Sequence, residues 1–164
     1  MKRLEKSSRS VCSLTTFYLF SIRPEYAQAI FEGKKKFELR RGRGAGLEEG
    51  GIAVVYVSGR IKEIRGEFTI GRLRIGTPQE IWRYVKRKNP GGITPESWMF
   101  IKGSRSSVAI EIMNPRLYKV FLSLREIRRV YPDWSPPMGY IRLNPGDGVF
   151  QSFILPIRKL SFES

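Results

Sequence analysis

The hydrophobic and polar positions of the chain alternate between patterns typical of short strands and patterns typical of short helices. The apolar stretch from Leu14 to Ile22 predicts a buried strand. Pro24 follows almost directly and suits the first turn of a helix, where no backbone N–H is needed as a donor. Gly33 is a typical end for that helix. Between Lys35 and Arg41 apolar and charged residues alternate, which predicts a half-buried strand.

The middle of the chain has the same mixture. Residues 52–57 are continuously apolar and predict a second buried strand. Residues 61–75 alternate, but the phase slips after Gly71, which predicts a bulge or bend in that strand. The sequence Thr77-Pro78-Gln79-Glu80 combines a capping Thr, a Pro and a Glu three residues after the Thr, and this combination predicts the start of a helix.

The last third is predicted to contain two strands, at 108–112 and 117–122, and a short helix after a second capping box at Ser123–Glu126. Two further pieces, at 140–143 and 153–157, are predicted to be short and extended. Because strands and helices are mixed without a regular βαβ alternation, the order of elements favours an α+β fold with a curved or closed sheet.

The length of 164 residues suits one domain with a real hydrophobic core. We expect residues 1–12, which are mainly polar and basic, to form a flexible N-terminal arm, and residues 13–164 to form a single domain. No apolar run is long enough to span a bilayer. We therefore expect a cytoplasmic protein without a membrane partner.

Charge is the strongest compositional signal. Thirty Lys and Arg residues against fifteen Asp and Glu residues give a net charge of +15 and a pI of about 10.4, so polyanions such as RNA are the expected partners. The chain has no His and a single cysteine, Cys12, which excludes a conventional Cys/His metal site and any Ser-His-Asp or Cys-His catalytic group. We expect neither a structural metal nor a cofactor.

The densest group of cations lies at residues 34–43, where six Lys or Arg residues are interrupted by Glu38. In a strand, Lys36, Glu38 and Arg40 would project to one side and form a basic face with one carboxylate. Arg can bind phosphate or stack on a base, and Glu can accept a hydrogen bond from a base amino group. The alternative is a solvated strand face in which Glu38 pairs with its neighbours. The Gly-rich residues 42–51 that follow form either a lid or a plain surface loop.

Three more residues are candidates for the same site. Arg23 precedes the first predicted helix and suits a phosphate. Tyr26 would either stack on a base or pack in the core. Glu67 would either face Lys35 or Arg40 across a cleft or form a structural ion pair elsewhere.

The N-terminal quarter of the sequence resembles a known family. The segments that carry the resemblance are Ser21–Ala27 (SIRPEYA), Ile30–Gly33 (IFEG), and Lys35 with Glu38-Leu39-Arg40. A strand that leads into a helix, a Gly that ends the helix, and a Gly-x-Lys-x-x-Glu-x-Arg strand are similar to the opening of the ASCH domain. Weaker similarity continues to about residue 143.

The resemblance implies a small PUA-like β-barrel of about five to seven strands with three to four short helices around it. It also implies a cleft beside the first helix and an association with RNA. Some ASCH relatives are enzymes that hydrolyse an acetylated cytidine nucleoside, and ribonuclease activity is known in others. In the amidohydrolases a Thr stands three residues after the Lys of the motif, whereas this chain has Glu38 three residues after Lys35.

The first hypothesis is therefore a non-catalytic domain that binds single-stranded RNA or a nucleotide-like ligand through Arg23, Tyr26, Lys35, Lys36, Glu38, Arg40 and Glu67. The alternative is an enzyme acting on nucleosides or RNA, with Lys35 and Glu38 as the catalytic residues. A regulatory module for a small anionic ligand is a third possibility.

Overall fold

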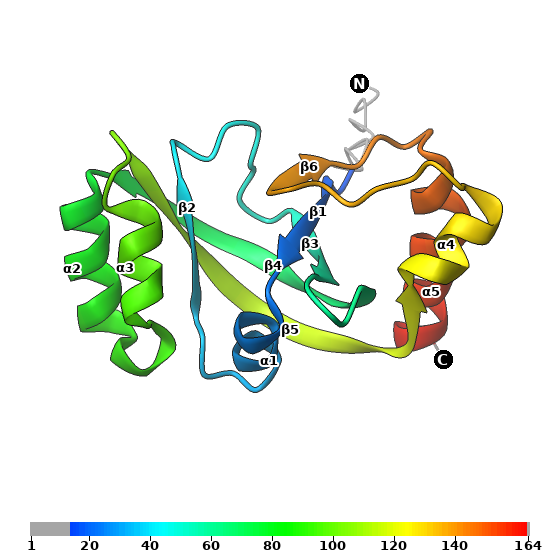
Figure 1. The fold of residues 1–164 in the computed structure, drawn as a ribbon, viewed down its shortest axis with the longest axis horizontal. Coiled ribbons are helices and arrows are strands. Elements are labelled where there is room, and N and C mark those ends of the chain that lie inside the picture. The colour runs from blue at the N-terminus through cyan, green and yellow to red at the C-terminus, as the bar shows by residue number, and fades with distance from the viewer. Residues whose placement is uncertain (1–13, 164) are drawn as a thin grey trace, which may run out of the picture.

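The computed structural model describes residues 14–163, so the expected N-terminal arm at 1–12 lies outside the described residues. A mixed six-stranded sheet, in the order β2-β5-β4-β3-β1-β6, forms the centre of the fold (Figure 1). Its strands are β1 (Phe17–Ile22), β2 (Phe37–Arg41), β3 (Ile52–Val57), β4 (Glu63–Gly76), β5 (Ser107–Ser123) and β6 (Tyr140–Arg142). β1 and β3 are parallel, and every other pair is antiparallel. The sheet is a curled half-barrel whose edges are β2 and β6.

Five α-helices cover the two ends and one side of this sheet. They are α1 (Pro24–Phe31), α2 (Pro78–Lys88), α3 (Pro95–Ile101), α4 (Leu124–Val130) and α5 (Leu155–Phe162). A 3-10 turn, η1 (Pro90–Gly92), joins α2 to α3, and a π-helical turn, η2 (Phe150–Ile154), leads into α5. The pair α2 and α3 lies at one end of the molecule, α4 and α5 lie at the other, and α1 lies between them (Figure 1). Within residues 14–163 the α+β prediction is confirmed and the six strands lie in the predicted range of five to seven, whereas the five α-helices exceed the predicted three to four.

The predicted helix starts are formed by the residues that the sequence indicated. Thr77 Oγ1 accepts from the Glu80 backbone N–H at 3.2 Å, and Glu80 Oε2 accepts from the Thr77 backbone N–H at 3.0 Å. Ser123 and Glu126 form the same reciprocal pair at the start of α4. Each capping box satisfies backbone donors that have no partner inside the helix.

Two predictions about the strands need correction. Residues 108–112 and 117–122 belong to one strand, β5, which passes Asn114 in a left-handed conformation (φ 47°) instead of breaking there. Residues 153–157 are helical and not extended, because Phe150 and Ile154, four residues apart, are both buried on one helical face. The bend predicted after Gly71 is confirmed, since the register of β4 with β5 shifts between Ile70 and Leu73.

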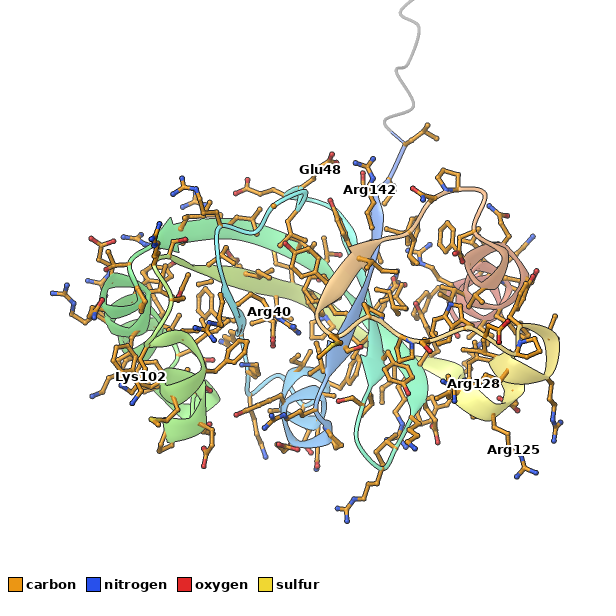
Figure 2. All side chains as sticks on the ribbon, turned by 45° about the horizontal axis from the view of Figure 1, so that its top comes forward. Arg40, Glu48, Lys102, Arg125, Arg128 and Arg142 are labelled. Carbon is orange, nitrogen blue, oxygen red and sulfur yellow. The ribbon has the colours of Figure 1, made fainter. Side chains whose placement is uncertain are left out.

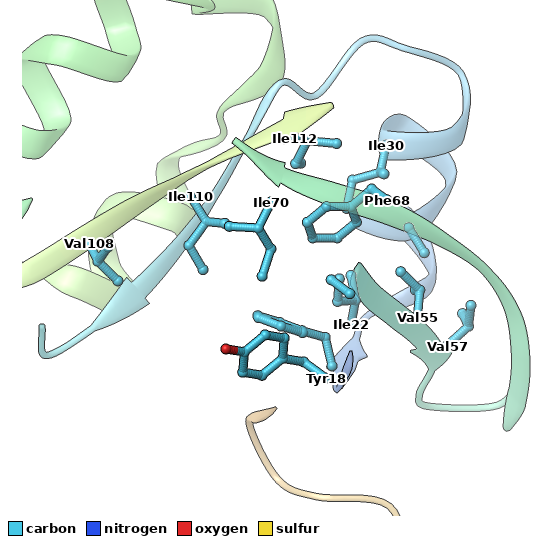
Figure 3. Close-up of a cluster of buried hydrophobic side chains, with 13 residues drawn as sticks. Tyr18, Ile22, Ile30, Val55, Val57, Phe68, Ile70, Val108, Ile110 and Ile112 are labelled. Carbon is cyan, nitrogen blue, oxygen red and sulfur yellow. The ribbon is translucent and has the colours of Figure 1, made fainter. Parts of the chain in front are cut away.

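Three clusters of buried side chains flank the sheet. Figure 3 shows the first, in which Phe68, Ile70 and Ile110 of β4 and β5 lie opposite Tyr18 and Ile22 of β1. The second packs α4, η2 and α5 against the other face of the sheet, and the third joins α2 and α3 to β2 and β5. All six residues of β3 are buried, because this central strand is covered on both faces.

Candidate functional site

A cleft of about 710 Å³ opens where five segments meet. These segments are the turn from β1 into α1, strand β2, the turn from β3 into β4, helix α3 and the loop at 136–138. Five of the predicted site residues line it, namely Arg23, Tyr26, Lys35, Glu38 and Arg40. The structure therefore brings together residues from the first helix and the second strand, as the sequence pattern predicted.

Three charged side chains form the buried floor of the cleft. Lys35 is 3% exposed and Glu38 is 8% exposed. Lys35 Nζ lies 3.8 Å from Glu38 Oε2, and Arg40 Nε lies 3.1 Å from Glu38 Oε1. One carboxylate is thus shared by two cations, so the floor carries a net positive charge.

Part of this hydrogen-bonding capacity is unused within residues 14–163. Glu38 Oε2 and Arg40 Nε are both buried without a hydrogen-bond partner there, since the 3.8 Å contact with Lys35 Nζ is too long for a hydrogen bond and the 3.1 Å contact of Arg40 Nε lacks the alignment of one. Buried polar atoms in proteins are nearly always satisfied, by protein groups, water or a ligand. Glu38 Oε2, which faces Lys35 Nζ at 3.8 Å, therefore has an accepting position that a water molecule or a ligand donor could fill.

Lys35 faces the cleft because its backbone is held on both sides. Gly33 takes a left-handed conformation (φ 77°), and the N–H groups of Lys34 and Lys35 both donate to the carbonyl of Ala29 at the end of α1. Asn89, which follows α2, then clamps the neighbouring residues. Its Nδ2 donates to the Lys34 carbonyl at 3.1 Å, and its Oδ1 accepts from the Lys36 N–H at 2.9 Å.

Arg40 is positioned by the β1–α1 turn and by an aromatic ring. Its Nη2 donates to the Ser21 carbonyl at 3.0 Å, and its guanidinium lies 5.4 Å from the centre of the Phe20 ring. The Ser21 hydroxyl donates to the Pro137 carbonyl at 2.5 Å and so holds the 136–138 loop beside the cleft. Figure 2 shows Arg40 in the middle of the molecule, between the two helical ends.

Aromatic and aliphatic side chains form the walls. The Tyr26 ring lies 5.1 Å from Lys35 Nζ, and its hydroxyl is 3.1 Å from Thr94 Oγ1, so this residue packs against its neighbours and also lines the cleft, while stacking on a base stays a prediction. Met99 and Phe100 of α3 and Met138 of the 136–138 loop line the mouth and are exposed. Exposed apolar side chains beside buried charges are suited to a ligand with a flat apolar face and polar edges.

Two predicted residues lie elsewhere. Lys36 precedes β2, is exposed, and contributes only its backbone to the Asn89 clamp. Glu67 is 1% exposed and does not line the cleft. It accepts hydrogen bonds from Arg116 at 3.0 Å, Tyr118 at 2.8 Å and Arg158 at 2.7 Å, which corrects the expectation that it faces Lys35 or Arg40. The alternative interpretation, a structural ion pair, describes this geometry.

Burial and the neighbouring Glu67 carboxylate raise the pKa of the Tyr118 hydroxyl well above its ordinary value, with burial the larger cause. The hydroxyl therefore stays protonated and donates to Glu67. This cluster ties α5 to the sheet, and none of its side chains lines the cleft.

The loop at 42–51 does not line the cleft either. Its carbonyls at Gly46 and Ala45 accept hydrogen bonds from the hydroxyls of Tyr18 (2.6 Å) and Tyr140 (2.9 Å). Glu48 in this loop pairs with Arg142 at 3.7 Å, and the two side chains are labelled together in Figure 2. The loop thus bridges from the β2 edge towards β6.

Sequence reasoning missed several lining residues, among them Lys62, Ser97, Phe100 and Met138. Lys62 stands in the alternating 61–75 segment, where nothing distinguishes it from its neighbours, and the other three come from segments more than fifty positions from the motif strand. Only the order of strands in the sheet brings them to the cleft.

Comparison with solved structures identifies the fold. The structure is similar to an ASCH protein from Zymomonas mobilis, with a TM-score of 0.68 and 18% identity over 79% of this chain and 88% of that chain. A point mutant of the same protein gives the same TM-score. The fold is therefore that of the ASCH domain, which is a PUA-like fold.

Two more solved structures share this fold. The N-terminal domain of McrB from Staphylothermus marinus has a TM-score of 0.53 and 12% identity over 79% of this chain and 88% of that chain. Human THYN1, solved in complex with 5-methylcytosine-containing DNA, has a TM-score of 0.51 and 16% identity over 92% of this chain and 100% of that chain. No protein-family model matches the sequence, and a search of curated proteins finds no match.

Two further observations concern residues 14–163 only. No group of three or more His, Cys, Asp or Glu side chains in this range is placed to hold a metal ion. No helix in it combines the length and the apolar character that crossing a lipid bilayer requires.

Proposed function

We propose that this protein binds single-stranded RNA and holds one base or nucleotide in the cleft. The observation that carries the proposal is the floor of the cleft, where two buried cations share Glu38 and leave its Oε2 without a hydrogen-bond partner among the described residues. A nucleotide complements this floor, since its phosphate suits the cations and a base amino group suits the free carboxylate oxygen.

The size and walls of the cleft support the same ligand. A volume of about 710 Å³ lies within the usual range of small-molecule sites, roughly 300–1,000 Å³. Phe100, Met138 and Tyr26 offer apolar or aromatic surface on which a flat base can stack. The net charge of +15 supplies long-range attraction to a polyanion. THYN1, which shares the fold, was solved with bound DNA.

The first test is fluorescence anisotropy of labelled single-stranded RNA and DNA in a salt series, with the wild type and the double variant Lys35→Ala/Arg40→Ala. A matched control is Lys86→Ala/Arg87→Ala, which removes the same charge from the exposed end of α2. We expect the wild type to bind RNA with a log–log salt slope of about 0.7 per phosphate contacted. The cleft variant should bind several-fold more weakly than the control.

Because the cleft residues are buried, thermal melts of each variant must accompany the titrations. Met138→Glu provides a second variant that cannot disturb the core, since Met138 is fully exposed at the mouth of the cleft. It places a negative charge where the base would enter and should also weaken binding. Equal affinity of wild type, cleft variant and Met138→Glu for RNA would show that binding is generic surface attraction. If the protein binds DNA more tightly than RNA, the ligand is DNA and the proposal that it is RNA is wrong.

A further inference from the structure

A second groove lies beside the cleft and is lined by cations. It has a volume of about 490 Å³ and runs between the turn from β3 into β4 and helix α4. The charged side chains that line it are Lys62, Arg125, Arg128 and Arg129, and no acidic side chain does. Figure 2 shows Arg125 and Arg128 on α4, at the end of the molecule opposite Lys102, with Arg40 in between.

The groove and the cleft are connected through one residue. Lys62 lines both of them, and it holds a left-handed conformation (φ 56°) in the turn before β4. Its carbonyl accepts the N–H of Leu124 at 2.9 Å, which fixes this turn against the start of α4. The charge of Arg128 also affects a residue in the wall of the cleft, Tyr56. Burial raises the pKa of Tyr56, a residue that lines the cleft, and the positive charge of Arg128 opposes this rise in pKa without cancelling it.

Within residues 14–163, no ion pair neutralises the four cations, Lys62, Arg125, Arg128 and Arg129. Arg128 and Arg129 lie in the last turn of α4, where cations are favourable for the helix. Arg125 lies in the first turn, where a cation is unfavourable. The stability of α4 therefore does not explain why a cation stands at Arg125.

We propose that this groove is a backbone track for a single-stranded nucleic acid whose base occupies the cleft. Phosphates on one side of the bound nucleotide would pass Lys62 and contact Arg125 and Arg129, while the base contacts stay in the cleft. The proposal rests on the proposed function, because it assigns the strand a path away from that site. Its occupant is a strand of several nucleotides, and a mononucleotide would fill the cleft without reaching α4.

The test compares a labelled trinucleotide with a labelled dodecanucleotide of the same RNA in a salt series. The variant is Arg125→Ala/Arg129→Ala, which leaves Arg128 and its hydrogen bond to the Trp134 carbonyl intact. The control is again Lys86→Ala/Arg87→Ala, which has the same net charge. We expect the trinucleotide to bind variant and control equally. The dodecanucleotide should bind the variant several-fold more weakly, with a salt slope lower by about 1.4, or about 0.7 for each lost phosphate contact.

The outcomes separate the two proposals. If the dodecanucleotide binds variant and control with the same affinity and slope, the track is wrong and the cleft proposal stands. If the variant binds both oligonucleotides more weakly, and by the same factor, the groove is either part of the cleft or attracts nucleic acid only through its charge. The track is again wrong in that case. If the wild type binds neither oligonucleotide, the proposed function fails, and the track fails with it.

Discussion

Arg158 of α5 donates a hydrogen bond of 2.7 Å to Glu67 of β4, although the two residues are 91 positions apart in the sequence. Arg116 and Tyr118 of β5 donate to the same carboxylate. Glu67 is 1% exposed, so its charge is stable only with these donors. The cluster fastens the C-terminal helix to the sheet, and this carboxylate does not line the cleft.

Replacing Glu67 should therefore destabilise the protein without removing the ligand site. Glu67→Ala leaves the buried Tyr118 hydroxyl without its acceptor, which costs about 1–3 kcal/mol, and removes the shared acceptor of Arg116 and Arg158, which are partly exposed and can turn to solvent. The free energy of unfolding, measured with urea, checks this value. Glu63→Ala on the same strand is the control, because Glu63 pairs with Arg65 near the surface, where the loss is about 1 kcal/mol or less. Equal losses for both variants would contradict the structural role of Glu67.

The raised pKa of Tyr118 predicts a loss of stability in alkali. In the unfolded chain a tyrosine ionises at about pH 10, whereas in the fold burial and Glu67 keep the Tyr118 hydroxyl protonated. The stabilisation is thus complete below pH 10 and is lost as the pH rises above that value, by up to about 1.4 kcal/mol per pH unit. Tyr118→Phe should flatten the dependence of the unfolding free energy on pH above about 10. An unchanged slope in this variant would contradict the assignment.

The Asn89 clamp predicts an indirect effect on the cleft. Asn89 bonds the backbone on both sides of Lys35, and Gly92 approaches it so closely that an added Cβ would collide with Asn89 Oδ1 and with the Lys34 carbonyl oxygen. Gly92→Ala should therefore displace the clamp and weaken RNA binding several-fold. Gly91→Ala is the matched control, because a Cβ at Gly91 meets no atom within 4 Å. Circular dichroism would show whether both variants are folded. If both are folded and bind RNA equally well, Asn89 does not position Lys35 for binding.

The sequence was sufficient to predict those features that depend on a few neighbouring residues. The capping boxes at Thr77 and Ser123 depend on contacts within four residues, so their patterns were sufficient. The strand-helix-strand motif also predicted that Lys35, Glu38 and Arg40 belong to one site, and all three line the same cleft.

Features that depend on the sheet topology could not be predicted from the sequence. Glu67 follows the same alternation as its neighbours, and nothing near it shows that Arg158 will reach it. The apolar run at 153–157 has no helical period of its own, and its helical form follows from packing against the second core cluster. Lys62 belongs to the cleft and to the groove only because the β3–β4 turn lies beside α4.

The free oxygen of Glu38 predicts which bases the cleft prefers. Cytosine, adenine and guanine carry an exocyclic amino group that can donate to Glu38 Oε2, whereas uracil has none. The wild type should therefore favour oligo-C over oligo-U by about 1.5–3 kcal/mol, the usual contribution of one hydrogen bond to a charged group. Anisotropy competition between the two oligonucleotides measures this preference.

The variant Glu38→Gln tests whether Glu38 affects the choice of base or only the overall charge of the cleft. The variant removes a negative charge from the floor, so affinity for oligo-U should rise. The amide can both donate and accept, so the preference for oligo-C should shrink. Glu96→Gln is the matched control, since Glu96 lines the same cleft but is exposed, and it should raise affinity for both oligonucleotides while leaving their ratio unchanged. If Glu38→Gln keeps the wild-type ratio, the carboxylate does not contact the base, and Lys35 and Arg40 bind the strand through phosphate alone.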